Sequence, residues 1–103
     1  MKKARVFVSD CLAGLLEELE KGKRYRFSYL QEYKGPSVSL EMPMTQKVYD
    51  FDRFPPFFEG VLPEGMMLDG LLRQTKIDRN DLMSQLMAVG GDLVGNVTVE
   101  EFL

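Results

Sequence analysis

Apolar and polar residues alternate along three short stretches in the first half of the chain, and a period of two residues predicts β-strands. Residues 4–8 are β-branched and aromatic, and residues 24–29 place three aromatic side chains on one face. Residues 38–42 place three apolar side chains on one face, and Pro43 ends this strand because proline lacks the N–H of a sheet ladder. Residues 44–54 show no clear period, so we expect irregular structure there.

The stretch from Leu12 to Leu19 fits both a helix and a strand. Its leucines have helical spacing, whereas Gly14 and the strand predicted just before it favour a second strand. We predict a strand that returns against residues 4–8 after a turn at Ser9-Asp10. Lys21-Gly22-Lys23 then supplies the turn into the aromatic strand.

The pattern changes to helical spacing after Pro55-Pro56, because proline suits the first turn of a helix. One apolar face of a short helix is formed by Phe57, Phe58, Val61 and Leu62. Pro63 ends this helix, and Glu64-Gly65 opens a second one, with the carboxylate favourably placed at the N-terminal end. The second helix has an apolar stripe at Met67, Leu68, Leu71 and Leu72.

A third amphipathic helix follows, with Asp78 as its predicted N-cap and Gly90-Gly91 at its end. Its apolar stripe consists of Leu82, Met83, Leu86, Met87 and Val89. Residues 94–99 indicate a final strand, in which Gly95 marks a bulge or a close approach. The order of elements predicts an α+β fold, a small antiparallel sheet with about three helices packed on it, as a single domain over residues 1–103.

The types of residue present exclude several kinds of catalytic and metal site. The chain has no histidine, which excludes Ser-His and Cys-His dyads and most zinc sites. Cys11 is the single cysteine, and we expect it to be a small buried apolar residue rather than a nucleophile. We expect no metal and no cofactor. No signal-peptide core and no run of about 18 apolar residues occurs, so we expect a cytoplasmic protein without membrane contact.

The net charge of −3 is unevenly distributed. Residues 1–34 hold eight Lys/Arg against five Asp/Glu, whereas residues 35–103 hold five against eleven. The acidic second part argues against direct nucleic-acid binding. The basic run over residues 21–26 is interpreted as a charged turn with its strand flanks rather than as a phosphate site.

Two patterns resemble parts of enzyme sites without completing them. Residues 90–96 are glycine-rich but lack the Lys-Ser/Thr of a P-loop, and a strand rather than a helix is expected after them. The carboxylate pairs Asp50/Asp52 and Glu59/Glu64 lie among solvated charges, where no raised pKa for general acid–base catalysis is expected. We therefore expect a protein that is not an enzyme.

Four of the seven methionines lie in the second and third predicted helices. Methionine adapts to irregular surfaces and occurs at binding faces. Met67, Met83 and Met87 fall on the apolar stripes, and we expect them in the core. Met66 lies beside the stripe, directly after Pro63-Glu64-Gly65, and two interpretations stay open: it projects toward a partner, or it fills the core.

The most distinctive motif is Phe57-Phe58-Glu59-Gly60-Val61-Leu62-Pro63-Glu64-Gly65. Three others accompany it: Tyr25-Arg26-Phe27-Ser28-Tyr29, Val38-Ser39-Leu40-Glu41-Met42-Pro43 and Gly91-Asp92-Leu93-Val94-Gly95. In this order they resemble the N-terminal subdomain of HipA-type serine/threonine kinases, whose Phe-Phe-x-x-Leu-Leu-Pro-Glu-Gly segment has leucine where this chain has Val61. The kinase core that follows in the family, with its ATP-binding loop and catalytic Asp, is not in these residues, so they cannot transfer phosphate.

The resemblance extends to HipS-type antitoxins, in which this subdomain is a separate small protein. It implies a HipT-like kinase toxin as the partner, and a HipB-like helix-turn-helix DNA-binding protein in the same complex. We expect Phe57, Phe58 and Leu62 to support a rigid corner, and acidic side chains to complement a basic kinase site. The predicted partner-binding residues are Glu59, Leu62, Pro63, Glu64, Gly65, Met66, Met67 and Asp69. Relatives often carry a bulky aromatic residue at the position of Met66.

An alternative is that the chain is the N-terminal scaffolding subdomain, as a fragment, of a longer HipA-type kinase. Against it, we interpret Glu100-Glu101-Phe102-Leu103 as a polar chain end rather than a cut strand. A third class, a small hydrolase or nucleotide-binding enzyme, lacks the residues that its chemistry needs.

Overall fold

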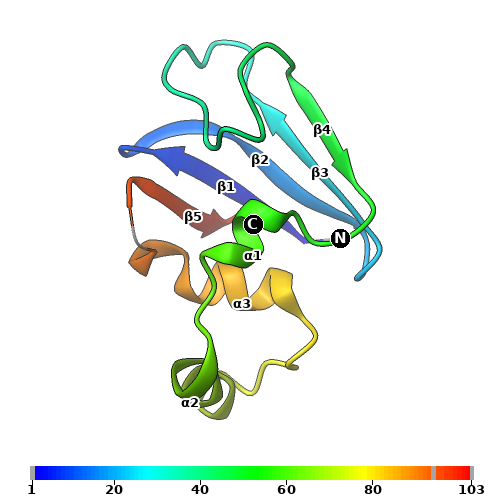
Figure 1. The fold of residues 1–103 in the computed structure, drawn as a ribbon, viewed down its shortest axis with the longest axis vertical. Coiled ribbons are helices and arrows are strands. Elements are labelled where there is room, and N and C mark those ends of the chain that lie inside the picture. The colour runs from blue at the N-terminus through cyan, green and yellow to red at the C-terminus, as the bar shows by residue number, and fades with distance from the viewer. Residues whose placement is uncertain (1, 94, 103) are drawn as a thin grey trace.

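The computed structural model describes residues 2–93 and 95–102, and its framework is one antiparallel sheet (Figure 1). The five strands are β1 (Lys3–Val8), β2 (Cys11–Glu20), β3 (Arg24–Tyr29), β4 (Val48–Phe51) and β5 (Val97–Glu101). Their order in the sheet is β4-β3-β2-β1-β5, so the last strand pairs with the first. All four pairings are antiparallel, as predicted.

The helices lie between β4 and β5 in the sequence: α1 (Pro56–Gly60), α2 (Gly65–Thr75) and α3 (Leu82–Val89), followed by the 3-10 turn η1 (Gly90–Asp92). Figure 1 shows α1 and α3 beside the sheet, while α2 lies at the far end of the molecule. The predicted α+β class with three helices is confirmed, although α2 buries none of its residues. Among the helices of the described residues, none is long and apolar enough to cross a membrane.

The core lies between the sheet and the two helices α1 and α3. Val6, Leu16 and Phe27 from three neighbouring strands are fully buried, as are Phe58 of α1 and Leu86 of α3. The rings of Phe27 and Phe58 have centroids 6.2 Å apart. Burial of a side chain of this size contributes about 1.5–3 kcal/mol relative to exposure, and this holds α1 on the sheet.

The ambiguous leucine-rich stretch is strand β2, as predicted. Leu16 faces the core, whereas Leu15 is half-buried on the opposite face, which is the alternation of a strand. Gly14 has a packing role, because a Cβ atom there would overlap the carbonyl oxygen of Ser28 in β3. Only glycine lets these two strands approach so closely at that point.

The turn between β1 and β2 places the cysteine at the surface. Ser9 and Asp10 have φ angles of 49° and 67°, the positive values that a two-residue type I′ hairpin turn requires. The N–H of Ser9 donates to the carbonyl oxygen of Asn96 at 2.8 Å. Cys11 follows as the first residue of β2 and is exposed, so the expectation of a buried cysteine is wrong.

No strand forms over residues 38–42, which corrects the prediction. Val38 and Met42 are buried, but Leu40 between them is 96% exposed, so the stretch does not present one apolar face. The Tyr29 hydroxyl accepts a hydrogen bond from the Val38 N–H at 2.9 Å and donates one to the Met42 carbonyl. A side chain, rather than a neighbouring strand, therefore satisfies this backbone.

Strand β4 falls in the stretch that was expected to be irregular. Tyr49 and Phe51 are half-buried against the core, and Asp50 between them accepts a hydrogen bond from Arg26 of β3 at 2.6 Å. Residues 49–52 do alternate, but the strand has only four residues and begins with the exposed Val48, so the period of two is too short to stand out. The sequence alone does not reveal that Asp50 has a cross-strand partner.

The third helix starts three residues later than its predicted cap allows. Asp81, not Asp78, is the N-cap, and its carboxylate accepts a hydrogen bond from the Ser84 N–H at 3.1 Å. The buried amide of Gln85 donates to the carbonyl oxygens of Asp78 and Arg79 at 3.1 and 2.9 Å. These bonds hold Asp78 and Arg79 outside the helix.

The chain after α3 follows the prediction in outline. The helix ends at Val89, but Gly90 keeps right-handed helical angles with φ −55°, so no left-handed cap forms. Gly95 has φ +96° and open space around it, which makes it a turn residue rather than a bulge or close approach. Glu100 and Glu101 belong to β5 and pair with β1, contrary to the polar end we expected. Val94 lies outside the described residues.

Candidate partner-binding site

The corner between α1 and α2 rests on buried aromatic side chains. Pro55 is buried, Pro56 begins α1, and Phe58 is fully buried beneath it. The Phe57 ring meets the Phe58 ring edge-on, with centroids 5.1 Å apart. Leu62 is also buried, so this member of the predicted site supports the corner from beneath and does not form its surface.

Hydrogen bonds and one glycine fix the direction of the chain through the corner. The N–H groups of Val61 and Leu62 donate to the carbonyl oxygens of Phe58 and Glu59 at 3.3 and 3.2 Å and close α1. Gly65 has φ +59°, a left-handed conformation that costs other residues roughly 1–2 kcal/mol. Glycine at this position therefore lets α2 leave the corner without strain.

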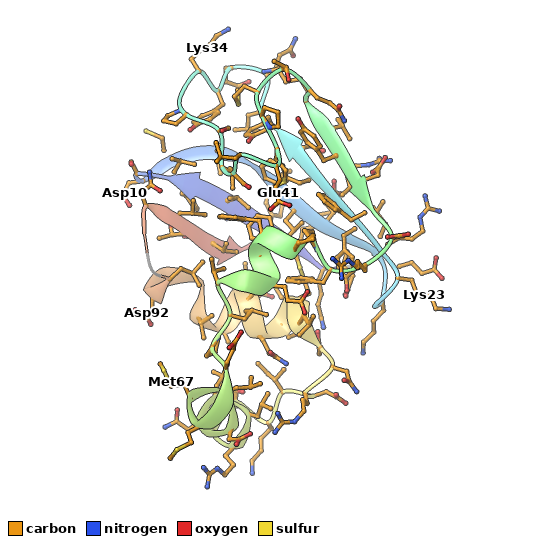
Figure 2. All side chains as sticks on the ribbon, in the orientation of Figure 1. Asp10, Lys23, Lys34, Glu41, Met67 and Asp92 are labelled. Atoms are coloured by element: carbon orange, nitrogen blue, oxygen red, sulfur yellow. The ribbon has the colours of Figure 1, made fainter. Side chains whose placement is uncertain are left out.

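Helix α2 exposes the apolar side chains that follow the corner. Met66 is 88% exposed and Met67 is 76% exposed, and Figure 2 shows Met67 projecting from the side of α2. Met66 thus projects outward, whereas the expectation that Met67 lies in the core is wrong. The two methionines open a shallow groove along the helix, lined by Met66, Met67, Gly70, Leu71, Arg73 and Gln74. By contrast, Met83 is fully buried and Met87 packs against the core, as expected.

The three predicted acidic contacts differ in their surroundings. The carboxylate of Asp69 forms an ion pair with Arg79 at 2.6 Å, which ties α2 to the segment before α3. Glu59 and Glu64 are exposed, and within the described part of the chain neither takes part in an ion pair. Two of the three carboxylates are therefore available to a basic partner, while Asp69 is already paired.

The sequence did not mark Leu40 as a surface residue, because its alternating neighbours indicated a strand. Glu41 and Met42, which follow it, line a small crevice together with Pro55, Pro56 and Phe57. The exposed Leu40 thus adjoins the entry to α1. The one signal available in the sequence was that Gly35-Pro36 and Pro43 bracket the stretch, which is typical of a loop.

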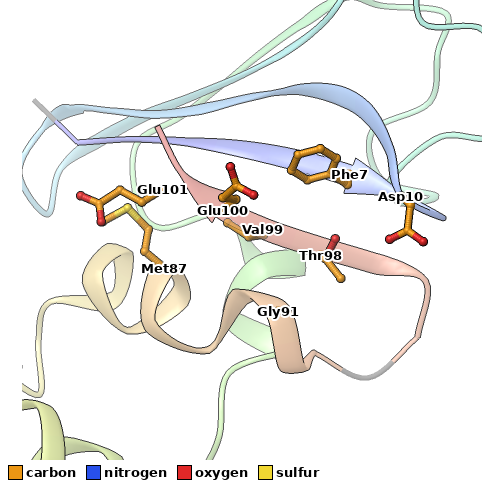
Figure 3. Close-up of a pocket in the computed structure, with 8 residues that line it drawn as sticks. All are labelled: Phe7, Asp10, Met87, Gly91, Thr98, Val99, Glu100 and Glu101. Atoms are coloured by element: carbon orange, nitrogen blue, oxygen red, sulfur yellow. The ribbon is translucent and has the colours of Figure 1, made fainter. Parts of the chain in front are cut away.

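A hollow beside β5 lacks the features of a small-molecule binding site. Figure 3 shows Phe7 on one side of the strand and Met87 and Gly91 on the other. The lining residues do not converge on one enclosed space with placed polar groups, which small-molecule sites require. Within residues 2–93 and 95–102, no three Cys, Asp or Glu side chains gather in a way that would hold a metal ion.

The most perturbed titratable group belongs to the β2–β3 hairpin. The Tyr25 hydroxyl donates to the buried carboxylate of Glu18 at 3.0 Å, and the Gly22 N–H donates to the same carboxylate at 3.4 Å. Burial, together with this hydrogen bond to Glu18, raises the pKa of Tyr25 to about 12. Glu18 and Tyr25 are direct cross-strand partners in the β2–β3 ladder, so we assign this pair a structural role.

The fold and the corner define a small α+β domain with two exposed methionine side chains on the helix that follows the corner. The family model described as HipA N-terminal domain matches residues 4–100. The chain therefore belongs to the HipA N-terminal domain family, in agreement with the resemblance of its four motifs.

Two known proteins are similar over nearly the whole chain. A Haemophilus influenzae protein described as uncharacterized is 30% identical over 101 residues, which cover 98% of this chain and 93% of that protein. A solved structure described as the N-terminal domain of HipA toxin has a TM-score of 0.78 and 27% identity, covering all of this chain and 94% of that one.

Proposed function

We propose that this chain is the antitoxin of a three-component HipBST-like toxin–antitoxin system, and that it binds and neutralises a HipT-like serine/threonine kinase. The exposure of Met66 and Met67 on a helix without buried residues carries the proposal. A helix that starts at a fixed corner presents these side chains from an already ordered backbone, so binding has to order only the side chains themselves. A HipB-like DNA-binding protein would be the third component.

In the proposed complex, the corner docks across a kinase lobe and residues 63–67 point toward the active-site region. Met66 would fill an apolar slot, because its unbranched thioether side chain adapts to irregular pockets. Glu59 and Glu64 would face the basic groups that bind nucleotide phosphates. Phosphoryl transfer depends on positioning and charge stabilisation, so a chain lodged there stops catalysis without any chemistry of its own.

The Haemophilus influenzae relative supports the small-protein form of this function. The shared region makes up 93% of that relative, so that protein consists of little beyond this domain. In the alternative, a scaffolding subdomain of a longer kinase, the same corner would pack within one polypeptide. A stop codon after Leu103 with a kinase reading frame beside it would distinguish the two.

Co-expression with a HipA-type kinase whose reading frame lies beside that of this chain tests the proposal. We expect growth arrest by the kinase alone, growth with the wild-type chain, and renewed arrest with Met66→Asp. Met66→Leu should still neutralise, since it keeps an apolar side chain of similar size. Val48→Asp is the matched control, because it places a carboxylate at another exposed apolar position, on the far edge of the sheet.

Solubility and folding of each variant are checked by circular dichroism before the growth result is interpreted. Growth arrest that persists with the soluble wild-type chain present overturns the proposed function. Normal neutralisation by a folded Met66→Asp variant removes Met66 from the contact surface.

A further inference from the structure

Leu40 occupies a tight, hydrogen-bonded turn. The Met42 N–H donates to the Ser39 carbonyl at 3.0 Å, and the Glu41 N–H donates to the Ser39 hydroxyl at 3.1 Å. Leu40 and Glu41 are thus the two central residues of a β-turn, positions where Gly, Pro, Asn, Asp and Ser are usual. A leucine that is 96% exposed at such a position buries almost no apolar surface, so it does not stabilise the fold.

Three tyrosines hold the long loop that carries this turn. Residues 30–47 contain no helix or strand, a length at which loops are usually functional or disordered. The Tyr33 hydroxyl donates to the Pro36 carbonyl and the Tyr49 hydroxyl to the Pro43 carbonyl, each at 2.6 Å. Tyr29 binds both Val38 and Met42, as described above, and its ring stacks on that of Tyr33 with an interplanar angle of 3°. Single exposed apolar residues are common, but here hydrogen bonds fix the backbone of the turn that presents Leu40.

The turn adjoins the candidate site. Glu41 and Met42 share a crevice with Pro56 and Phe57 at the start of α1, and α1 leads through residues 61–64 to Met66. In Figure 2, Glu41 lies just above α1 and Met67 lies on α2 beyond it. Leu40, α1 and the methionines of α2 therefore follow one another along the molecule.

The free carboxylates follow the same path. Glu41, Glu59 and Glu64 are exposed, and among the residues that the structure describes none of the three is in an ion pair. Six other carboxylates have cationic partners, namely Glu17, Glu20, Asp50, Asp69, Asp81 and Glu100, whereas exposed ones such as Glu32, Asp52 and Glu101 are, within the described residues, also outside any ion pair. What distinguishes Glu41, Glu59 and Glu64 is therefore their place along the path from the turn to α2. A surface with free negative charge around apolar anchors complements a positively charged protein surface.

We propose that Leu40 is a second anchor of the partner-binding surface, which runs from Leu40-Glu41 across α1 to Met66-Met67. Its occupant is a protein that offers two separate apolar pockets bordered by lysine and arginine. This inference rests on the proposed function and deepens it, because it makes the kinase contact extend well beyond the corner. A single anchor would let the bound chain rotate about it, whereas two anchors on separate elements fix its orientation.

Binding of the purified chain to a catalytically inactive form of the kinase used for co-expression tests this inference. We expect Leu40→Asp to weaken the affinity about tenfold or more, as for a buried interface anchor, with an unchanged thermal midpoint. Leu40→Met should bind like the wild-type chain. Glu41→Arg should slow association and reduce its dependence on salt, whereas Glu101→Arg on β5 makes the same charge change away from the surface and should do neither.

Wild-type affinity of folded Leu40→Asp, alongside weak binding of Met66→Asp, overturns the second anchor and leaves the proposed function standing. Absence of binding by the wild-type chain overturns the proposed function itself. Sedimentation of the chain alone gives the remaining test. If it self-associates and Leu40→Asp makes it monomeric, a second copy occupies the surface and the inference is wrong.

Discussion

Gly90, which directly follows α3, lies so close to β5 that a Cβ atom there would overlap the carbonyl oxygen of Val99. This approach brings the end of α3 and the turn η1 onto the edge strand of the sheet. The neighbouring Gly91 is exposed and has open space where its Cβ atom would be. The two adjacent glycines therefore have different structural roles.

We predict that Gly90→Ala lowers the free energy of unfolding by about 1–3 kcal/mol, because the strand or the helix must move to accept the methyl group. Gly91→Ala is the matched control and should be neutral or slightly stabilising, since it only restricts the unfolded chain. Urea denaturation of both variants measures the difference. Equal stability of the two would contradict the close contact.

Gly65→Ala should cost about 1 kcal/mol of stability for a different reason. Its φ of +59° is unfavourable for a residue with a Cβ atom, although no neighbouring atom would clash. Gly60→Ala, at the end of α1 with equally open surroundings, is the control and should be neutral. Thermal denaturation gives the result, and a shift as large for Gly60→Ala would mean that the conformation of Gly65 is not the cause.

The Tyr25–Glu18 pair predicts a loss of stability in alkaline solution. Burial and the hydrogen bond to Glu18 raise the pKa of Tyr25 from 10.0 in the unfolded chain to about 12 in the folded one. A group whose pKa is raised on folding contributes stability below pH 10 and loses it as the pH rises toward 12. Wild-type protein should therefore become less stable over this interval, as followed by denaturation at fixed pH values.

Tyr25→Phe is the corresponding variant. At neutral pH it should be less stable by about 1–3 kcal/mol, because the buried Glu18 carboxylate loses a hydrogen-bond donor. Its stability should also fall less between pH 10 and 12 than that of the wild-type chain. An identical alkaline slope in both proteins would assign the transition to other groups.

Asp81 predicts a loss of stability in acid. Burial by itself would raise the pKa of Asp81, but hydrogen bonds from Lys2 and Ser84 outweigh it and hold this pKa below the usual value. A lowered folded-state pKa gives stability that is present above about pH 4 and is lost as the pH falls further. Asp81→Asn should keep the cap of α3, lose less than about 1 kcal/mol at pH 7, and show a flatter acid limb. An unchanged acid limb would contradict the role of Asp81.

Much of the fold was accessible from local pattern. The aromatic residues of β3 alternate, so their burial on one face could be predicted. The position of Phe57 and Phe58 after two prolines predicted α1. The failures have a common physical cause. Val38, Leu40 and Met42 look like a strand, yet the Tyr29 hydroxyl, ten or so residues away in sequence, takes the place of the strand partner. Likewise, β4 is only four residues long and is a strand because it pairs with β3, a partner that local pattern does not reveal.

In the candidate site, too, some features could be predicted from the sequence and others could not. The sequence located the corner at Pro63-Glu64-Gly65, because proline and glycine constrain the backbone wherever they occur. It did not separate the stripe of α2 from that of α3, since both have apolar residues at helical spacing. Only the tertiary structure shows that Met83 is covered while Met67 is exposed.

The sequence by itself thus determined the α+β class, the strand and helix types of most elements, and the family, because each depends on local periodicity or on short ordered motifs. The tertiary structure decided which apolar residues meet another surface. Burial is a property of the whole packed chain, so the exposure of Leu40, Met66 and Met67 follows from where the sheet, α1 and α3 complete the core without them.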